Sequence, residues 1–320
     1  MKLQHIILLA FSVIATLFAN DKYYETRDNV IGFQDFRSNL PNQLLPTPKE
    51  RLQAYRMAFF YVPKGITEAM AEKEAKWYKD AGFNMVLGDK YRMLIIDLVP
   101  EEANKEARRP IDQIIRDTRI FFQAVHKHGM ETMHHVTCTM VPQVLLAKHP
   151  DWAAINLNTG KTDTNTYGTG NTCINNDAFW NLWFARLERL LKESPADAVM
   201  IDEIQFFAPY LCGCASCREK FHKDTGFELP PNGQFKGWGQ RQPEALRRWR
   251  RWRGEKVLER QQQCRRLLKS LNSQAVFSAY QCNNTTSYNY YSFALEPSNL
   301  ATYADSVGLE SMPHGLDYAK

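Results

Sequence analysis

Residues 198–204 read AVMIDEI, an apolar run of strand length that ends in two adjacent acids, Asp202 and Glu203. A continuous apolar run of this length is typical of a strand that is buried on both faces of a parallel sheet. Adjacent side chains of a strand point to opposite faces, but both can reach the rim where the strand ends. Two acids at that place suit a general acid/base; a structural ion pair is the alternative interpretation.

Working outward from this run, similar apolar runs alternate with helical patterns along the chain. The runs that predict strands lie at 56–62, 84–87, 131–137, 275–280 and 305–309. The patterns that predict helices lie at 67–81, 110–128, 177–192 and 241–269. Such alternation indicates βαβ units and a parallel sheet. No G-x-G-x-x-G follows the first predicted strand, which argues against a dinucleotide-binding fold.

Polar and ionisable residues cluster where the predicted strands end. They are Asp89, His134, His135, Asp202, Glu203, Gln281, Asn283 and Glu310. In (β/α)8 barrels this rim is where chemistry is built. We therefore predict an α/β protein of the TIM-barrel type over residues 51–320. The sequence ends at Lys320, ten residues after Glu310, so we expect a barrel without its last one or two β/α units, either a fragment or a barrel with unconventional closure.

The N-terminus predicts export. Lys2 is followed by an apolar run from Ile6 to Phe18 and then by Ala19 and Asn20. This is the pattern of a secretory signal, which we assign to residues 1–19, and the run is too short to span a bilayer comfortably. A polar lead-in covers residues 20–50. We expect a secreted or periplasmic protein with no membrane contact after cleavage; a retained N-terminal anchor is the alternative.

Basic residues are concentrated in one predicted helix, at 241–269, although the net charge of the chain is only +5. One interpretation is a nucleic-acid-binding patch, which requires clustered Lys and Arg. The other is an amphipathic helix on the outside of the barrel. We favour the second, and expect no nucleic-acid partner, because apolar residues recur at helical spacing and acids stand among the arginines. The arginines are Arg247, Arg248, Arg250, Arg251, Arg253, Arg260, Arg265 and Arg266.

Three cysteines form a C-x-C-x-x-C cluster, at Cys212, Cys214 and Cys217. Three thiolates so close together cannot all pair with one another, and tetrahedral zinc accepts such a set with one further ligand. Disulfides are the usual expectation for an exported protein. The chain has seven cysteines, so any full disulfide scheme leaves at least one unpaired. Both zinc and disulfides remain open on this pattern.

The segment 202–221 (DEIQFFAPYLCGCASCREKF) resembles family 42 glycoside hydrolases, the β-galactosidases. In that family an Asn-Glu pair ends the fourth strand and a C-x-C-x-x-C cluster follows. The resemblance implies that Glu203 is the general acid/base. It also implies a structural zinc held by the three clustered cysteines and an earlier one, for which Cys173 matches better than Cys138. The segment 149–160 (HPDWAAINLNTG) resembles hypothetical glycosyl hydrolase family 6.

Two positions depart from the family pattern. Asp202 stands where the family has Asn, and in other hydrolase barrels, such as α-L-fucosidases, an Asp at the end of the fourth strand is the nucleophile. The resemblance therefore leaves Asp202 as a catalytic candidate. The family's own nucleophile is a Glu at the end of the seventh strand. Glu310 matches an acidic residue of the sixth strand, so we expect it to bind substrate, with a nucleophile's role as the alternative.

Four further residues are candidates for substrate binding. His134 and His135 end the third predicted strand, where an imidazole can hydrogen-bond a sugar hydroxyl or be satisfied within the core. Phe206 belongs to an apolar wall that would raise a carboxyl pKa, and Asn283 is a weaker candidate. The sequence thus predicts a glycoside hydrolase with a carbohydrate substrate, a β-galactosidase-like activity and a structural zinc. A non-catalytic carbohydrate-binding barrel or an inactive fragment is the alternative.

Overall fold

The computed structural model describes residues 55–90, 94–99, 109–164, 169–282, 289–295 and 304–310. The chain divides into two units, Met1–Ala54 and Tyr55–Lys320. The first unit, with the predicted secretory signal and lead-in, lies outside the described residues, as does Asn283. Within the described part, no helix combines the length and apolar character needed to cross a membrane.

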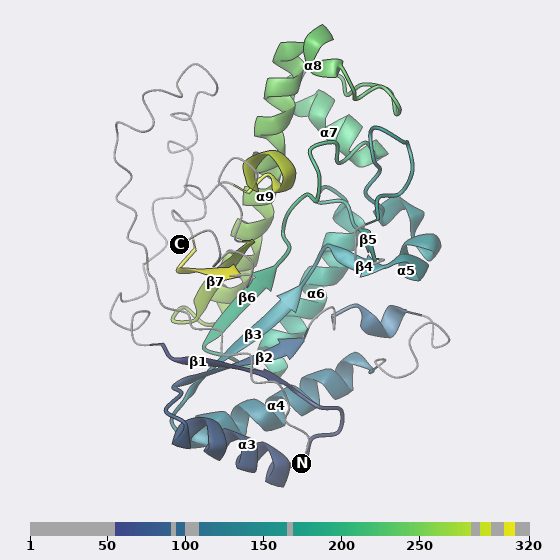
Figure 1. The fold of residues 1–320 in the computed structure, drawn as a ribbon. Coiled ribbons are helices and arrows are strands. Elements are labelled where there is room, and N and C mark those ends of the chain that lie inside the picture. Colours follow the sequence, from purple (N-terminus) through teal and green to yellow (C-terminus); the bar gives the residue numbers. More distant parts are fainter. Residues whose placement is uncertain are drawn as a thin grey trace, which may run out of the picture. The chain divides into compact units, whose positions relative to one another are not determined.

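A six-stranded parallel sheet organises the second unit, in the order β1-β2-β3-β6-β7-β8 (Figure 1). Each strand pairs with the next parallel strand along the chain, which is the order of a (β/α) barrel. The predicted α/β class and its six parallel strands are confirmed, with strand ends that differ from the prediction by at most three residues. The strands are β1 (Met57–Tyr61), β2 (Met85–Lys90), β3 (Glu131–Thr137), β6 (Ala198–Asp202), β7 (Val276–Cys282) and β8 (Ser306–Glu310).

The predicted helices also form, and local capping explains two of their starts. They are α3 (Glu68–Asp80), α4 (Ile111–Lys127), α6 (Asp177–Glu193) and α9 (Pro243–Leu271). The Thr67 hydroxyl accepts from the backbone N–H of Met70 before α3, and the Asn176 side chain accepts from that of Phe179 at 2.8 Å before α6. A side chain in this position satisfies a backbone donor that the first helical turn leaves unpaired.

One apolar core lies between the first two strands and the helices α3 and α4. Ala58 of β1 and Val86 of β2 face Ala75 of α3 and Phe121 of α4 in this cluster. Because side chains alternate along a strand, Phe59 and Tyr61 lie on the other face of β1. Their exposures are 46% and 52%. The helix-facing side of the sheet is therefore the packed side at β1.

Two excursions leave the carboxyl ends of β3 and β6. The first was predicted as a loop from about 138 to 175, and the structure corrects this. It contains an antiparallel pair and two short helices, namely β4 (Met140–Pro142), α5 (Gln143–Lys148), η4 (Pro150–Trp152) and β5 (Thr169–Asn171). The second contains α7 (Ala215–Thr225) and α8 (Trp238–Arg241), which were not predicted. Figure 1 shows β4, β5 and α7 beyond the arrowheads of β3 and β6.

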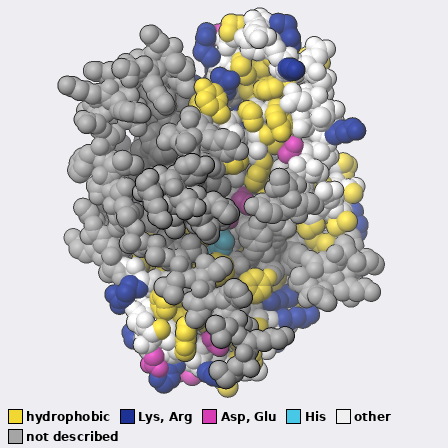
Figure 2. Space-filling model, viewed as in Figure 1, with side chains coloured by type: hydrophobic (Ala, Val, Ile, Leu, Met, Phe, Trp, Pro, Cys, Tyr) yellow, Lys and Arg dark blue, Asp and Glu magenta, His cyan; other side chains and the backbone are white. Residues whose placement is uncertain are grey.

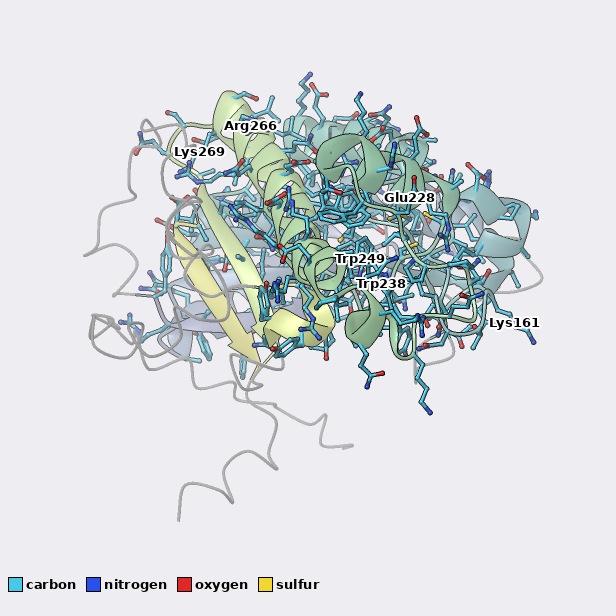
Figure 3. The ribbon with its side chains drawn as sticks, turned by 90° about the horizontal axis from the view of Figure 1, so that it is seen from above. Lys161, Glu228, Trp238, Trp249, Arg266 and Lys269 are labelled. Atoms are coloured by element: carbon cyan, nitrogen blue, oxygen red, sulfur yellow. The ribbon has the colours of Figure 1, made fainter. Side chains whose placement is uncertain are left out.

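The basic segment is a single 29-residue helix, α9, whose apolar side chains are buried as predicted. Figure 3 shows Trp249 towards one end of α9 and Arg266 and Lys269 towards the other. Two of its arginines, Arg253 and Arg265, lie on the buried face instead of in solvent, which sequence analysis did not predict. Figure 2 shows the described Lys and Arg side chains in separate groups among hydrophobic and neutral ones.

Polar side chains tie neighbouring strands together at the amino-terminal edge of the sheet. Asn84, before β2, accepts from the N–H of Arg56 at 2.6 Å. Asp197, before β6, accepts from the N–H of Thr132 at 2.8 Å, and Asp305, before β8, accepts from that of Phe277 at 2.8 Å. These three strand ties join β1 to β2, β3 to β6 and β7 to β8. The intervening neighbours are joined there by backbone bonds, Glu131 N–H to Asn84 O and Val276 N–H to Asp197 O.

Candidate active site and metal centre

The strand β6 carries the two predicted catalytic acids to the carboxyl edge of the sheet. Asp202 is 7% exposed and Glu203 is 8% exposed. Glu203 has φ of 64°, the left-handed region that costs a non-glycine residue about 1–2 kcal/mol. Residues held in this way concentrate at functional sites. The left-handed step also ends the alternation of the strand, so Asp202 and Glu203 need not lie on opposite faces.

The backbone of the acid pair is held by the residues that follow β3. The Cys138 thiol donates to the carbonyl of Asp202 at 3.2 Å, and the Thr139 hydroxyl donates to the carbonyl of Glu203. The N–H of Gln205 donates to the same Glu203 carbonyl at 2.8 Å. Burial, first of all, raises the pKa of Cys138, so its thiol stays protonated and able to donate. Sequence analysis did not identify these hydrogen bonds, because residues 138–139 and 202–203 become neighbours only in the folded chain.

Of the two predicted histidines, His135 lies beside the acids. The register pairs β3 with β6 so that Thr137 lies opposite Asp202. Nε2 of His135 is 3.4 Å from Oδ2 of Asp202. Phe59 of β1 packs edge-on against the His135 ring, with centroids 6.0 Å apart. Three strands therefore bring an aromatic ring, an imidazole and a carboxylate into one contiguous group.

His134 and Phe206 are engaged elsewhere. Nε2 of His134 donates to the carbonyl of Ser194 at 2.7 Å, and its ring packs on Phe122 of α4. The guanidinium of Arg253 lies 4.6 Å from the centre of the Phe206 ring, and Phe206 is 3% exposed. These contacts with helices give both side chains a packing role, and nothing in them supports the predicted role in substrate binding.

Glu310 is the last residue of β8 and pairs in register with Cys282 of β7. It therefore lies at the carboxyl edge of the sheet, the same edge as Asp202 and Glu203. Its role, like that of Asn283, which lies outside the described residues, stays a prediction.

The four predicted metal-binding cysteines come together in one buried cluster. The Sγ atoms of Cys173, Cys212, Cys214 and Cys217 all lie within 4.8 Å of one another. The Sγ of Cys173 is 3.4 Å from that of Cys217 and 3.3 Å from that of Cys214. Four sulfurs at about 2.3 Å from a tetrahedral zinc lie about 3.8 Å apart. All four cysteines are free thiols, so the donor set and its spacing fit a metal.

Amide groups surround the sulfurs, as expected where thiolate charge has to be stabilised. The N–H of Ile155 donates to Sγ of Cys212 at 3.1 Å. Asn175 donates twice, from its N–H to Sγ of Cys173 at 3.3 Å and from Nδ2 to Sγ of Cys217 at 3.2 Å. Such outer contacts orient ligands and tune a metal site. Asn175 was not predicted, although it lies only two residues after Cys173.

The thiols influence one another's protonation. Hydrogen bonds from its neighbours, Cys173 first, lower the pKa of Cys214. Hydrogen bonding with Cys212 and Cys214 raises the pKa of Cys173, and burial raises that of Cys217. A metal ion at this cluster would displace the shared protons, because thiolate is the ligand form of cysteine.

Close packing connects the cysteine cluster with the excursion after β3. The N–H of Gly213 donates to the carbonyl of Ile155 at 2.7 Å. A Cβ at Gly213 would lie 2.6 Å from Cδ2 of Leu157, so any other residue between Cys212 and Cys214 would force the Leu157 side chain to move. Arg218 donates to the carbonyls of Gly213 at 3.0 Å and Pro230 at 2.9 Å. The cluster thus joins both excursions at the carboxyl side of the sheet.

The fold is similar to that of solved β-galactosidases. One from the Antarctic haloarchaeon Halorubrum lacusprofundi gives a TM-score of 0.58 at 13% identity, over 82% of this chain and 40% of that chain. A cold-adapted one from Rahnella sp. R3 gives 0.58 at 15% identity, over 84% and 41%. A catalytic mutant of a family 42 β-galactosidase from G. stearothermophilus gives 0.54 at 14% identity, over 77% and 37%.

No family model matches the chain, and no curated protein matches it. At identities of 13–15% the structural likeness concerns the fold. It confirms the predicted TIM-barrel type and, at the level of the fold, the predicted resemblance to family 42. The chain spans only 37–41% of the length of these three structures, so the likeness covers part of each protein.

Proposed function

We propose that this chain forms a glycoside hydrolase barrel that cleaves O-glycosyl bonds of the β-galactoside type, with Glu203 as general acid/base. The observation that carries the proposal is the buried acid pair at the carboxyl end of β6, with Glu203 in a left-handed conformation. Support comes from the fold, which is similar to that of solved β-galactosidases. The carboxyl edge of a barrel sheet is also where such enzymes build their chemistry.

In this mechanism Glu203 donates a proton to the glycosidic oxygen while the bond from that oxygen to the anomeric carbon breaks. Positive charge then develops on the sugar ring, and the neighbouring carboxylate of Asp202 would stabilise that charge. His135 stays beside Asp202 through the 3.4 Å contact and can orient that carboxylate or a sugar hydroxyl. Glu203 afterwards accepts a proton from the attacking water.

The identity of a nucleophile belongs to the same proposal. A retaining enzyme needs a second carboxylate about 5–5.5 Å from the acid/base, and an inverting enzyme one at about 6.5–9.5 Å. We propose Asp202 as the first candidate, since it adjoins Glu203 and contacts His135. Glu310, at the end of β8, is the second.

We further propose that the four clustered cysteines hold a structural zinc. Zinc favours four thiolate ligands in tetrahedral geometry, and the described sulfurs provide that set. The ion would contribute no reacting atom. Its part would be to fix the loop that runs from Glu203 to Cys214, and with it the position of the acid/base.

The activity is tested with the full chain and aryl β-galactosides. Glu203→Gln should lower turnover of a substrate with a poor leaving group by about 10²–10⁴-fold. It should affect dinitrophenyl galactoside less, because that leaving group needs little protonation. Glu228→Gln is the control, since Glu228 is exposed and pairs with His222; Figure 3 labels it. Unchanged turnover in Glu203→Gln refutes the proposed role.

The rival function, a non-catalytic carbohydrate-binding barrel, gives a different result in the same experiment. Galactoside binding by the wild-type chain without turnover, and with equal affinity in Glu203→Gln, would establish it. Turnover that Glu203→Gln abolishes while binding persists would exclude it.

A further inference from the structure

Arg253 is a buried cation in the middle of α9, with 0% exposure. A buried charge is strongly unfavourable unless hydrogen bonds and an opposite charge compensate for its lost hydration. The hydrogen bonds are present: its guanidinium donates to the carbonyls of Ala208 at 2.7 Å, Ser292 at 2.8 Å and Tyr291 at 2.9 Å. It also lies over the Phe206 ring.

These carbonyls belong to two segments at the carboxyl side of the sheet. Ala208 lies in the loop 203–214, which starts at the proposed acid/base Glu203 and ends at the metal-binding cysteines. Tyr291 and Ser292 lie in the short π-helix η5 (Asn289–Phe293), which follows β7. The N–H of Phe206 also donates to the carbonyl of Phe293 at 3.0 Å. Arg253 therefore clamps the loop 203–214 to η5.

Among the residues the structure describes, Arg253 forms no ion pair with Asp or Glu. Burial lowers the pKa of Arg253. A metal ion at the cysteine cluster would leave a net negative charge there, because four thiolates outweigh one Zn²⁺.

Short structural links connect Arg253 with the cluster. The carbonyl of Ala208, which accepts from Arg253, also accepts from the N–H of Leu211 at 3.1 Å, and Leu211 immediately precedes the ligand Cys212. On α9, Trp249 and Trp252 precede Arg253 by four residues and one residue. Their rings pack against Phe221 of α7, with centroids 5.3 and 5.4 Å apart. The helix α7 carries Cys217 in its first turn.

We propose that Arg253 is the buried counter-charge of the metal–tetrathiolate centre and the positioning residue of the loop that carries Glu203. This inference rests on the proposed metal site. Four thiolates and one Zn²⁺ carry a net charge of about −2, which one buried guanidinium partly offsets. Metal at the cysteines and order in the loop 203–214 are therefore coupled, and the coupling acts equally in both directions.

The first test measures zinc affinity by competition with a chromophoric chelator in the purified full chain. Arg253→Met should bind zinc at least tenfold more weakly than wild type. Arg253→Lys should recover part of the loss, because it keeps the charge but not the planar fork. Arg265→Met is the matched control, because Arg265 is also buried on α9 but pairs with Asp305 instead of the loop. Its zinc affinity should stay unchanged even where the fold is less stable.

The second test needs no substitution and covers the case in which Arg253→Met does not fold. Amide hydrogen exchange of the wild-type chain is compared with and without zinc. Zinc removal should accelerate exchange in 203–214 and in 289–293, more than at the strand ties. Equal loss of affinity in Arg253→Met and Arg265→Met, or unchanged exchange, overturns the inference. A wild-type chain that binds no metal overturns it together with the metal site. Neither test uses turnover, so both are independent of the proposed glycosidase activity.

Discussion

At the scale of the residue, Glu203 combines the proposed chemistry with an unfavourable backbone conformation. Its φ of 64° suits glycine better than any residue with a Cβ. Two hydrogen bonds hold Glu203 in this conformation. The Thr139 hydroxyl and the N–H of Gln205 both donate to the carbonyl of Glu203. Strain of this kind is retained at functional positions at some cost in stability.

Substitution at Glu203 should therefore separate stability from function. Both Glu203→Gly and Glu203→Ala remove the carboxylate, but only glycine relieves the left-handed conformation. We expect Glu203→Gly to be more stable than Glu203→Ala by about 1 kcal/mol, measured by urea unfolding with tryptophan fluorescence.

A matched pair of positions serves as control for this prediction. Ala294 has φ of 57°, so Ala294→Gly should also be stabilising, whereas Ala279→Gly in the extended strand β7 should destabilise. Equal stability of Glu203→Gly and Glu203→Ala would mean that the conformation at this position carries no strain.

A second prediction at this scale concerns the cysteines. Cys173→Ser should lose most of the bound zinc, because it removes one of four ligands, while Cys264→Ser should keep it. Cys264 is an equally buried thiol on α9 outside the cluster. Zinc per chain is measured by elemental mass spectrometry of the purified variants. A full complement of zinc in Cys173→Ser, or disulfides among the four cysteines in the wild type, contradicts the metal assignment.

At the scale of the element, the Asp197 strand tie makes the stability of the sheet depend on pH. Burial alone would raise the pKa of Asp197, but hydrogen bonds from His126 and from the N–H of Thr132 outweigh it, and the net shift is downward. A carboxylate with a lowered folded-state pKa stabilises the fold above its unfolded pKa of about 4. This contribution is lost as the pH falls through the folded-state pKa.

Asp197→Asn should accordingly weaken the dependence of melting temperature on pH below about pH 4. The measurement is a series of thermal melts between pH 2 and 6, compared with Asp112→Asn. Asp112 is largely exposed and pairs with Arg189 on the surface, so its removal should leave the slope as in wild type. Identical slopes in all three proteins would show that the Asp197 tie contributes nothing.

The elements themselves were predictable to very different degrees. Runs such as AVMIDEI identify their strands because an unbroken apolar stretch of strand length, here Ala198–Ile201, leaves few alternatives. The strands β4 and β5 have three residues each, too few for any periodic pattern. Helix α7 buries only Cys217 and Phe221, so it presents almost no apolar stripe to detect.

The site was predictable only where the types and spacing of residues that are close in sequence indicate a function. Cys212, Cys214, Cys217 and the acid pair could be named because their types and spacing are distinctive, whereas Cys173 was named only through the resemblance to family 42. The contact between His135 and Asp202 depends on the register of β3 and β6, which no local pattern determines. The burial of Arg253 depends on carbonyls far along the chain, so the sequence alone suggests a solvated arginine.

At the scale of the whole molecule, the proposed metal centre should stabilise both excursions at once. The cluster takes Cys173 from the excursion after β3 and three cysteines from the one after β6. Chelation of zinc should lower the melting temperature of the full chain by at least about 5 °C, since a structural zinc contributes folding energy directly. Cys173→Ser provides the control, because its melting temperature should not respond to chelator. If chelation leaves the melting temperature of the wild type unchanged, the metal does not contribute to the stability of the whole chain.

The strand ties also affect which parts of such a domain can change during evolution. They lie at the amino-terminal edge of the sheet, while both excursions leave from the opposite edge. An insertion between β3 and β6 therefore lengthens the connection without reaching the bond from Thr132 to Asp197. Backbone bonds join the remaining neighbouring strands at the same edge, so the register of the whole sheet is held there. The length and sequence of the excursions can therefore vary at the carboxyl edge while the amino-terminal edge keeps the architecture constant.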